Sequence, residues 1–157
     1  MKRIYITGMS GTGKSSVIER LQFRGFTAID TDYDDWCGLS ILDGEPEWIL
    51  REDRLYELLK ASSISSLFVS GCSSNQTKFY IFFDHIVLFS APLEVMLERV
   101  AQRTSNPYGK NEKERTELIW NFEHIQPLLK KNADLEIDTT TMSIDEITDN
   151  LIKLASD

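Results

Sequence analysis

The stretch Gly8–Ser15, GMSGTGKS, constrains this chain most strongly, because it fits the pattern G-x-x-x-x-G-K-[ST] at every fixed position. Glycines at this spacing allow backbone angles that a side chain forbids, so successive N–H groups turn inward and form a nest for an anion. Lys14 would then reach the β- and γ-phosphates of a nucleotide, and the Ser15 hydroxyl would bind Mg²⁺. The pattern therefore predicts a nucleotide-phosphate site formed by Gly8, Ser10, Gly11, Thr12, Gly13, Lys14, Ser15 and Ser16.

The segments around this loop predict an α/β domain. A β-branched and aromatic run at 4–7 indicates a buried strand before the loop, and apolar residues at helical spacing indicate a helix after it. Strands alternate with helices further along, which favours a mostly parallel sheet covered on both faces, in one domain over 1–157. We expect strands at 26–29, 67–69, 86–89 and 135–137, a loop at 33–46, helices at 48–61, 78–83, 92–102 and 112–131, and a last helix with a capping box formed by Ser143 and Glu146.

Bulk properties narrow the choice of partners and setting. The formal charge is −8 and there is no basic tract, which speaks against a nucleic-acid partner. No apolar run is long enough to span a bilayer, so no membrane partner is expected. Cys37 and Cys72 fit no metal-binding spacing and are typical of reduced thiols. The chain runs into a strand within a few residues, without a signal peptide, so the expected setting is the cytoplasm.

Two carboxylates follow the second predicted strand, in Asp30-Thr31-Asp32. Ligands of open parallel sheets collect at the carboxyl ends of the strands, so this pair would lie near the phosphate loop. With Ser15, Asp30 and Asp32 are candidate ligands of Mg²⁺, directly or through water. Asp32 is also the expected general base for an attacking hydroxyl. The alternative is a pair of solvated acids in a turn.

The third predicted strand ends in Ser70-Gly71, where hydrolytic motors and switches usually carry an acid that reaches Mg²⁺. Transfer to a bound hydroxyl needs mainly positioning and charge neutralisation, so this end favours a kinase over a motor. The loop that follows is the expected acceptor site, with Gly71, Cys72, Asn75 and Gln76 as candidate contacts. Helix capping is the alternative for Asn75.

Cations on the later segments could serve a transferring phosphoryl group. Arg99 and Arg103 lie four residues apart on one helix and would project toward the same region, together with Lys110. The segment at about 103–111 would close over the nucleotide as a lid. Ion pairs with nearby glutamates are the alternative for the arginines.

Several other residues have a functional and a structural interpretation. Arg54, like Arg51, could face an acceptor, although neighbouring acids favour surface pairing. Trp36 and Trp48 could stack on a ring or anchor a loop. His85 and His124 have no metal-ligand spacing and are expected to be structural.

Taken together, these motifs resemble those of the shikimate kinase, gluconate kinase and adenylate kinase group of P-loop kinases, over nearly the whole chain. The resemblance implies a three-layer P-loop NTPase fold with a five-stranded parallel sheet in the order 2-3-1-4-5, and ATP as donor. It also implies that Arg99 lies near the adenine, Arg103 on the phosphates, and the turn at 139–142, including Thr140, beside the base. Two features differ from shikimate kinases: Cys72-Ser73 replaces glycines, and Ile125 replaces the arginine that grips the substrate carboxylate. Shikimate is therefore not the expected acceptor, whereas gluconate and nucleosides stay open.

The sequence thus leads to two hypotheses. The first is a monomeric or weakly dimeric kinase that uses MgATP, with Lys14, Asp32 and Arg103 as catalytic residues and a small molecule as acceptor. The second is a nucleotide-dependent regulatory or binding module that holds its nucleotide without transferring phosphate. Phosphorylation of a polynucleotide end is disfavoured by the acidic balance.

Overall fold

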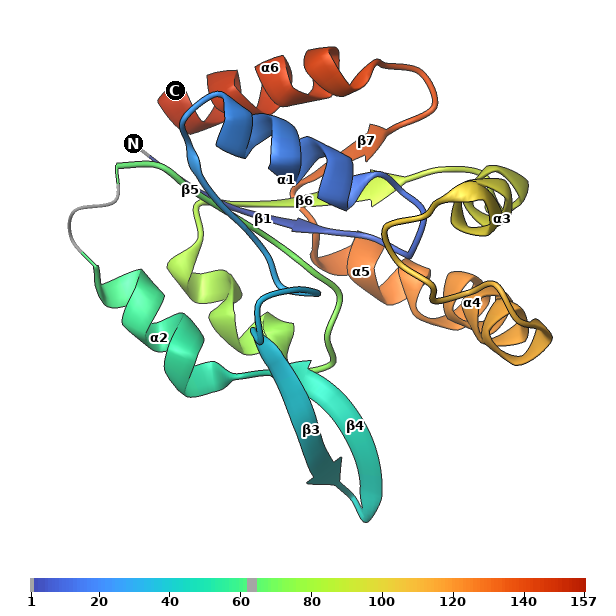
Figure 1. The fold of residues 1–157 in the computed structure, drawn as a ribbon. Helices are drawn as coiled ribbons and strands as arrows, with labels where there is room; N and C mark the ends of the chain where they lie inside the picture. Colours follow the sequence, from blue (N-terminus) through green and yellow to red (C-terminus); the bar gives the residue numbers. More distant parts are fainter. Residues whose placement is uncertain (1, 62–64) are drawn as a thin grey trace.

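A computed structural model describes residues 2–61 and 65–157 and contains a five-stranded parallel sheet. The strands are β1 (Arg3–Thr7), β2 (Thr27–Asp30), β5 (Leu67–Ser70), β6 (His85–Ser90) and β7 (Leu135–Asp138). They lie in the order β2-β5-β1-β6-β7 (Figure 1). Numbered along the chain without the two strands of a separate hairpin, this is the order 2-3-1-4-5, which confirms the expected fold.

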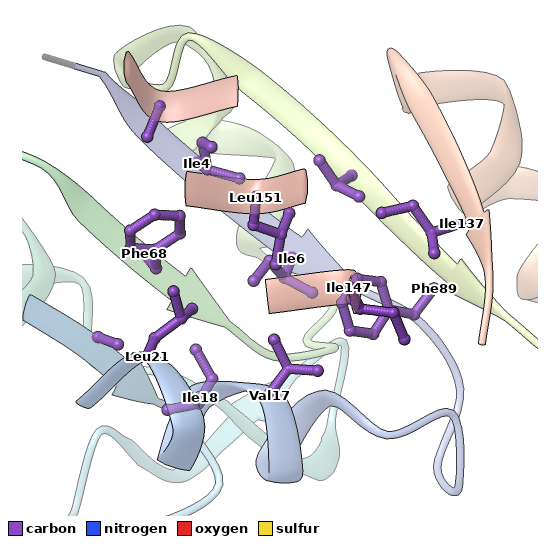
Figure 2. Close-up of a cluster of buried hydrophobic side chains, with 13 residues drawn as sticks. Ile4, Ile6, Val17, Ile18, Leu21, Phe68, Phe89, Ile137, Ile147 and Leu151 are labelled. Atoms are coloured by element: carbon purple, nitrogen blue, oxygen red, sulfur yellow. The ribbon is translucent and has the colours of Figure 1, made fainter. Parts of the chain in front are cut away.

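Two helices cover one face of the sheet, α1 (Lys14–Phe23) and α6 (Ile144–Ser156). Val17, Ile18 and Leu21 recur at helical spacing and are buried together with the side chains of the central strands. Figure 2 shows this cluster, in which Ile147 and Leu151 of α6 meet the same strands. The packing fixes the start of α1, and with it the phosphate loop, at the carboxyl end of β1.

The other face is covered by α2 (Glu52–Lys60) and the 3₁₀ helix η1 (Gln76–Phe82) near β5, and by α3 (Leu93–Gln102) and α5 (Gln126–Asn132) near β6. α4 (Glu112–His124) packs against α3 and α5 (Figure 1). The expected capping box of α6 is confirmed, because Ser143 Oγ accepts from the Glu146 N–H and the Glu146 side chain accepts from the Ser143 N–H. Within the described ranges, no helix has both the length and the apolarity to cross a bilayer.

The prediction of a loop at 33–46 and a helix from 48 was wrong. Residues 37–50 form an antiparallel hairpin, β3 (Cys37–Leu42) and β4 (Glu45–Leu50), that projects from the body of the molecule (Figure 1). Its turn is Asp43-Gly44, with positive φ at both residues (52° and 81°), as a tight hairpin turn requires. Trp48 and Ile49 belong to β4 and pair with β3, so α2 begins only at Glu52.

The expected continuous helix at 112–131 is also divided. α4 ends at His124 and α5 begins at Gln126, with Ile125 between them. Pro127 explains the break, because proline lacks an N–H and its ring clashes with the preceding turn of a continuous helix.

Candidate active site

The phosphate loop joins β1 to α1 and is built around glycines. A Cβ on Gly8 would lie 2.4 Å from the Phe89 carbonyl oxygen, and one on Gly11 would lie 2.7 Å from that of Met96. Gly11 and Gly13 also have positive φ values of 86° and 98°. The loop therefore depends on glycine for both its backbone angles and its close packing.

Lys14 bridges the two ends of this loop. Its Nζ donates hydrogen bonds to the carbonyl oxygens of Gly8 (2.6 Å) and Met9 (3.0 Å). The ammonium group is thereby held over the nest, at the first residue of α1. The N-terminal end of a helix attracts anions, so the loop amides, the helix and the ammonium group all favour binding of an anion at this place.

Ser15 and Asp30 meet beside the loop. The Ser15 hydroxyl donates to Asp30 Oδ2, and the Asp32 N–H donates to Asp30 Oδ1 at 3.0 Å. Burial raises the pKa of the Asp30 carboxyl, against the opposing effect of the Ser15 hydrogen bond. A partly buried carboxylate beside a hydroxyl is the kind of oxygen pair that Mg²⁺ binds in phosphate sites, where it keeps several of its waters.

Ser70 adds a third oxygen at this place. It is the register partner of Asp30 on the neighbouring parallel strand, so both side chains project from the face of the sheet that α1 covers. Its Oγ is fully buried and makes no hydrogen bond with any described residue. A buried orphan hydroxyl next to Asp30 is consistent with a water or a hydrated ion at this position. The set of Ser15, Asp30 and Ser70 therefore fits Mg²⁺.

A cavity of about 300 Å³ lies over the loop. All of residues 10–16 line it, together with Asp32, Arg99, Arg103, Thr139 and Met142. Arg99 joins two of its walls, because its guanidinium donates to the Gly11 carbonyl (3.2 Å) and to Thr139 Oγ1 (2.9 Å). This first cavity, which we call the nucleotide cavity, thus extends from the phosphate loop to the turn after β7.

Thr140 lies differently from the expectation. Its N–H and hydroxyl both bond to Asp138 Oδ1, and it is exposed and outside the lining of the nucleotide cavity. The neighbouring Thr139 and Met142 line it instead. The turn at 139–142 thus lies at the nucleotide cavity as expected, but through Thr139 and Met142 and not through Thr140.

Arg103 holds the segment that follows α3. Its Nε donates to the Asn106 carbonyl (3.1 Å) and its Nη2 to that of Tyr108 (2.8 Å), while the guanidinium lines the nucleotide cavity. Burial lowers the pKa of Arg103, although an arginine remains charged at neutral pH. Gly109 packs the end of this segment closely on Val100 and Leu118. Lys110 is exposed and lines neither cavity.

A second cavity of about 610 Å³ adjoins the first, and we call it the acceptor cavity. The two share Ser10, Lys14, Asp32, Tyr33 and Asn106 in their linings. Its remaining wall comes mainly from the phosphate loop, the segment 31–36 (which we call the acidic loop), the hairpin, the segment after β5 and α4, and includes Trp36, Cys37, Trp48, Cys72 and Glu117. Asp32 and Lys14 therefore lie at the junction of two spaces.

Asn75 and Gln76 lie outside both linings. Asn75 Oδ1 accepts from the Leu50 N–H, and its Nδ2 donates to the Leu50 carbonyl and to Glu52 (all 3.0 Å). Gln76 accepts from Tyr5 and Ser73 and donates to Thr7 and Tyr80. Their polar atoms are used within the protein, so these contacts argue against the expected acceptor role. The alternative of helix capping does not hold for Asn75 either, because its side chain makes no capping hydrogen bond to η1.

Arg54 also binds within the protein. Its Nη1 donates to the Asp34 carbonyl, and its guanidinium lies 3.9 Å from the centre of the Trp36 ring. Arg54 thus holds the acidic loop and the Trp36 ring in place. Its own side chain lines neither cavity, whereas the acidic loop and Trp36 line the acceptor cavity.

Gly71 is required by packing rather than by a ligand. A Cβ there would lie 2.0 Å from Thr31 Oγ1, which donates to the Ser70 carbonyl. We expect Gly71→Ala to destabilise the protein by about 1–3 kcal/mol through overpacking, lowering the thermal midpoint by about 2–4 °C per kcal/mol. Gly38→Ala is the control, because its Cβ would meet only the movable end of Arg51 at 3.0 Å. Equal midpoints for the two variants in calorimetry would contradict this account.

Sequence reasoning missed several residues of the site. Ser70 was considered only as the position where hydrolytic motors carry an acid, and not as an oxygen of the site. Glu117 has no local sequence signal, because it reaches the acceptor cavity only through the packing of α4. Trp48 was placed on a helix, whereas it lies on the hairpin. The turn signal Asp43-Gly44 between two β-prone runs could have revealed that hairpin.

A loop with the pattern G-x-x-x-x-G-K-[ST] between the first strand and the first helix of such a sheet is typical of P-loop nucleotide-binding proteins. A model described as the AAA domain matches residues 4–120, more than half of the chain, and the chain belongs to that family.

Curated relatives come from two Aeromonas species, and both are called nucleotide-binding protein. Those of Aeromonas hydrophila subsp. hydrophila and Aeromonas salmonicida are 26% and 25% identical to this chain over 165 residues. The alignments cover 98% of this chain and 52% of each relative, so the chain spans about half the length of the curated relatives it matches.

Solved structures of small P-loop kinases share the fold. Shikimate kinase from Acinetobacter baumannii, in complex with shikimate, has a TM-score of 0.65 at 19% identity, over 98% of this chain and 92% of that one. Shikimate kinase from Bacteroides thetaiotaomicron has a TM-score of 0.60 at 17% identity, over 99% and 98%. The expected P-loop kinase fold is thereby confirmed.

Proposed function

We propose that this protein transfers the γ-phosphoryl group of MgATP to a hydroxyl or phosphate group of a small-molecule acceptor. One observation carries the proposal: two adjoining cavities share Lys14 and Asp32 in their linings. A triphosphate in the nucleotide cavity and an acceptor in the other would meet at these two side chains. Hydrolysis needs no second cavity of this size.

The nucleotide would lie with its phosphates on residues 8–15 and its base toward the turn after β7. Arg99 contacts both the loop and that turn, so it would hold the two ends of the nucleotide site in register. Arg103 would add positive charge next to the transferring group while it fixes the shape of the lid segment.

Ser15 and Asp30 would hold Mg²⁺, and Ser70 would bind one of its waters. The ion would supply neutralisation of the phosphate charge. Ser15 and Asp30 are already in contact, and Ser70 is the register partner of Asp30 on the neighbouring strand.

With a hydroxyl acceptor, one bond forms and one bond breaks at the γ-phosphorus. The acceptor oxygen forms a bond to the γ-phosphorus, and the bond from that phosphorus to the β–γ bridging oxygen breaks, which releases ADP. The hydroxyl proton passes to the Asp32 carboxylate, which stands between the two cavities. Lys14 stays near the phosphates, where charge moves toward the leaving oxygen.

The proposal is tested by acceptor-dependent ADP release. Nucleosides, nucleotides, sugar acids and aminoglycosides are added one at a time to the protein with MgATP, and a coupled assay records ADP. We expect at least one class to raise the rate well above the acceptor-free rate and to yield a phosphorylated product by mass spectrometry. Steady hydrolysis that no acceptor changes would count against a kinase.

A second candidate is a module that binds nucleotide without transferring phosphate. It is favoured by the curated relatives, which are called nucleotide-binding proteins and are about twice as long as this chain. Under this alternative the site serves as a nucleotide sensor for a larger protein, and the Asp32 carboxylate has no chemical role.

A further inference from the structure

The acceptor cavity has an acidic wall. Asp32, Asp34 and Glu117 lie in its lining together with Asp35. Among the described residues that line it, Lys14 is the one cation, and Lys14 is committed to the phosphate loop. The net charge of this lining is therefore negative, next to a site that binds a polyanion.

The protein neutralises this negative charge only in part, because the Arg103 guanidinium lies close enough to Asp32 to interact with its charge, whereas Asp34 and Glu117 form no ion pair with a described residue. Asp35 pairs with Arg51 (3.2 Å), and both side chains are well exposed. Arg54 donates to the Asp34 carbonyl rather than to its carboxylate. Glu117 accepts a hydrogen bond from the Tyr108 hydroxyl (2.6 Å), a neutral donor that orients the carboxylate and leaves its charge in place.

An aromatic surface stands beside these carboxylates. Trp48 lines the cavity and is 66% exposed. It pairs across the hairpin with Leu39, and the next pair on the same face is Ile41 with Pro46. The rim of the cavity is thus continuous with an apolar strip along the hairpin. An indole face binds apolar rings and also attracts cations.

Resting on the proposed function, we propose that the acceptor is a hydroxylated amine, bound as a cation, with an apolar or aromatic part. Its ammonium group is held by Asp34 and Glu117, its apolar part lies on Trp48, and its hydroxyl faces Asp32. Like-charge repulsion disfavours anionic acceptors in the same cavity. Sugar acids and nucleoside phosphates are therefore the poorest acceptors for this site.

Three probes with one skeleton test this assignment. They are 2-amino-1-phenylethanol, its N-acetyl derivative and mandelate, which share a phenyl ring and a hydroxyl and differ in carrying a positive, zero or negative charge. Binding to the full chain is measured by calorimetry in the presence of ADP and Mg²⁺. We expect the amine to bind about tenfold more tightly than the neutral probe, and mandelate to bind most weakly.

Variants separate charge from ring. Glu117→Gln weakens binding of the amine about threefold to fivefold and leaves the neutral probe unchanged. Glu123→Gln, the control, removes the same charge from the same helix outside the cavity and changes binding of neither the amine nor the neutral probe. Trp48→Ala weakens binding of both the amine and the neutral probe. Because Glu117, Glu123 and Trp48 are exposed, these variants are expected to fold.

The outcomes distinguish this inference from the proposed function. Absence of amine binding, equal or tighter binding of mandelate, or equal effects of the two glutamate variants would overturn the cationic acceptor. Phosphorylation of an anionic acceptor would do the same while the kinase proposal stands. Tight, Glu117-dependent binding of the amine without phosphoryl transfer would leave the cation site in place and contradict the kinase.

Discussion

Lys14→Ala is expected to weaken MgATP binding by about 10- to 100-fold, the effect of losing one charge-assisted hydrogen-bonding group. Turnover should fall further, by about 100- to 1,000-fold, because the ammonium also stabilises charge that develops during transfer. The reason lies in its position: Nζ bonds to the carbonyls of Gly8 and Met9 and so already stands over the loop that is proposed to bind the phosphates.

Calorimetry with MgATP and the ADP-release assay measure the two effects separately. Lys113→Ala, an exposed lysine on α4 outside both cavities, is the matched control and should behave like the unchanged protein. Thermal midpoints of the two variants show that both fold. Unchanged MgATP affinity in Lys14→Ala would mean that the loop does not bind a triphosphate at all, and the whole proposal would fall with it.

Asp32→Asn is expected to lower acceptor-dependent turnover by about 100- to 10,000-fold, the range that a general base contributes. The amide has nearly the same shape but cannot accept the hydroxyl proton. MgATP affinity should change little, because the phosphate loop is held in shape by Lys14 and the glycines rather than by Asp32. The effect therefore belongs to the chemical step.

Asp53→Asn provides the comparison, since Asp53 is an exposed acid on α2 away from both cavities. Single-turnover measurements with saturating MgATP separate the transfer step from product release. If Asp32→Asn retained turnover within about threefold of the unchanged protein, Asp32 would not be the base. Full nucleotide binding with no dependence on Asp32 would favour the nucleotide-binding module.

The parts of the fold that the sequence predicted well depend on local signals. The phosphate loop, the strand before it and the helix after it have residue types that only this arrangement explains, and β5 and β6 are apolar along nearly their whole length because both faces of the sheet are covered. The capping box of α6 is likewise contained within four residues. Such elements can be predicted from the sequence, because the residues that determine them are close together in the chain.

The parts that were predicted poorly depend on partners far apart in the chain. Asn75 and Gln76 have the polarity of substrate ligands, but Leu50 and Thr7 use their hydrogen-bonding groups across 25 and 69 positions of sequence. The acceptor cavity is assembled from the acidic loop, the hairpin, the end of β5 and α4, so its charge becomes visible only after folding. Trp48 was misplaced because its helical interpretation ignored the turn at Asp43-Gly44.

The attachment of the hairpin has an evolutionary consequence. Asn75 secures its root through both backbone groups of Leu50, and the Arg51 N–H bonds to the Trp36 carbonyl, while the outer residues from Leu39 to Trp48 contribute little to the central sheet. The tip can therefore be lengthened, shortened or replaced without disturbing the central sheet or the phosphate loop. Related chains could therefore differ in the length and sequence of this hairpin while the phosphate loop and the central sheet stay the same.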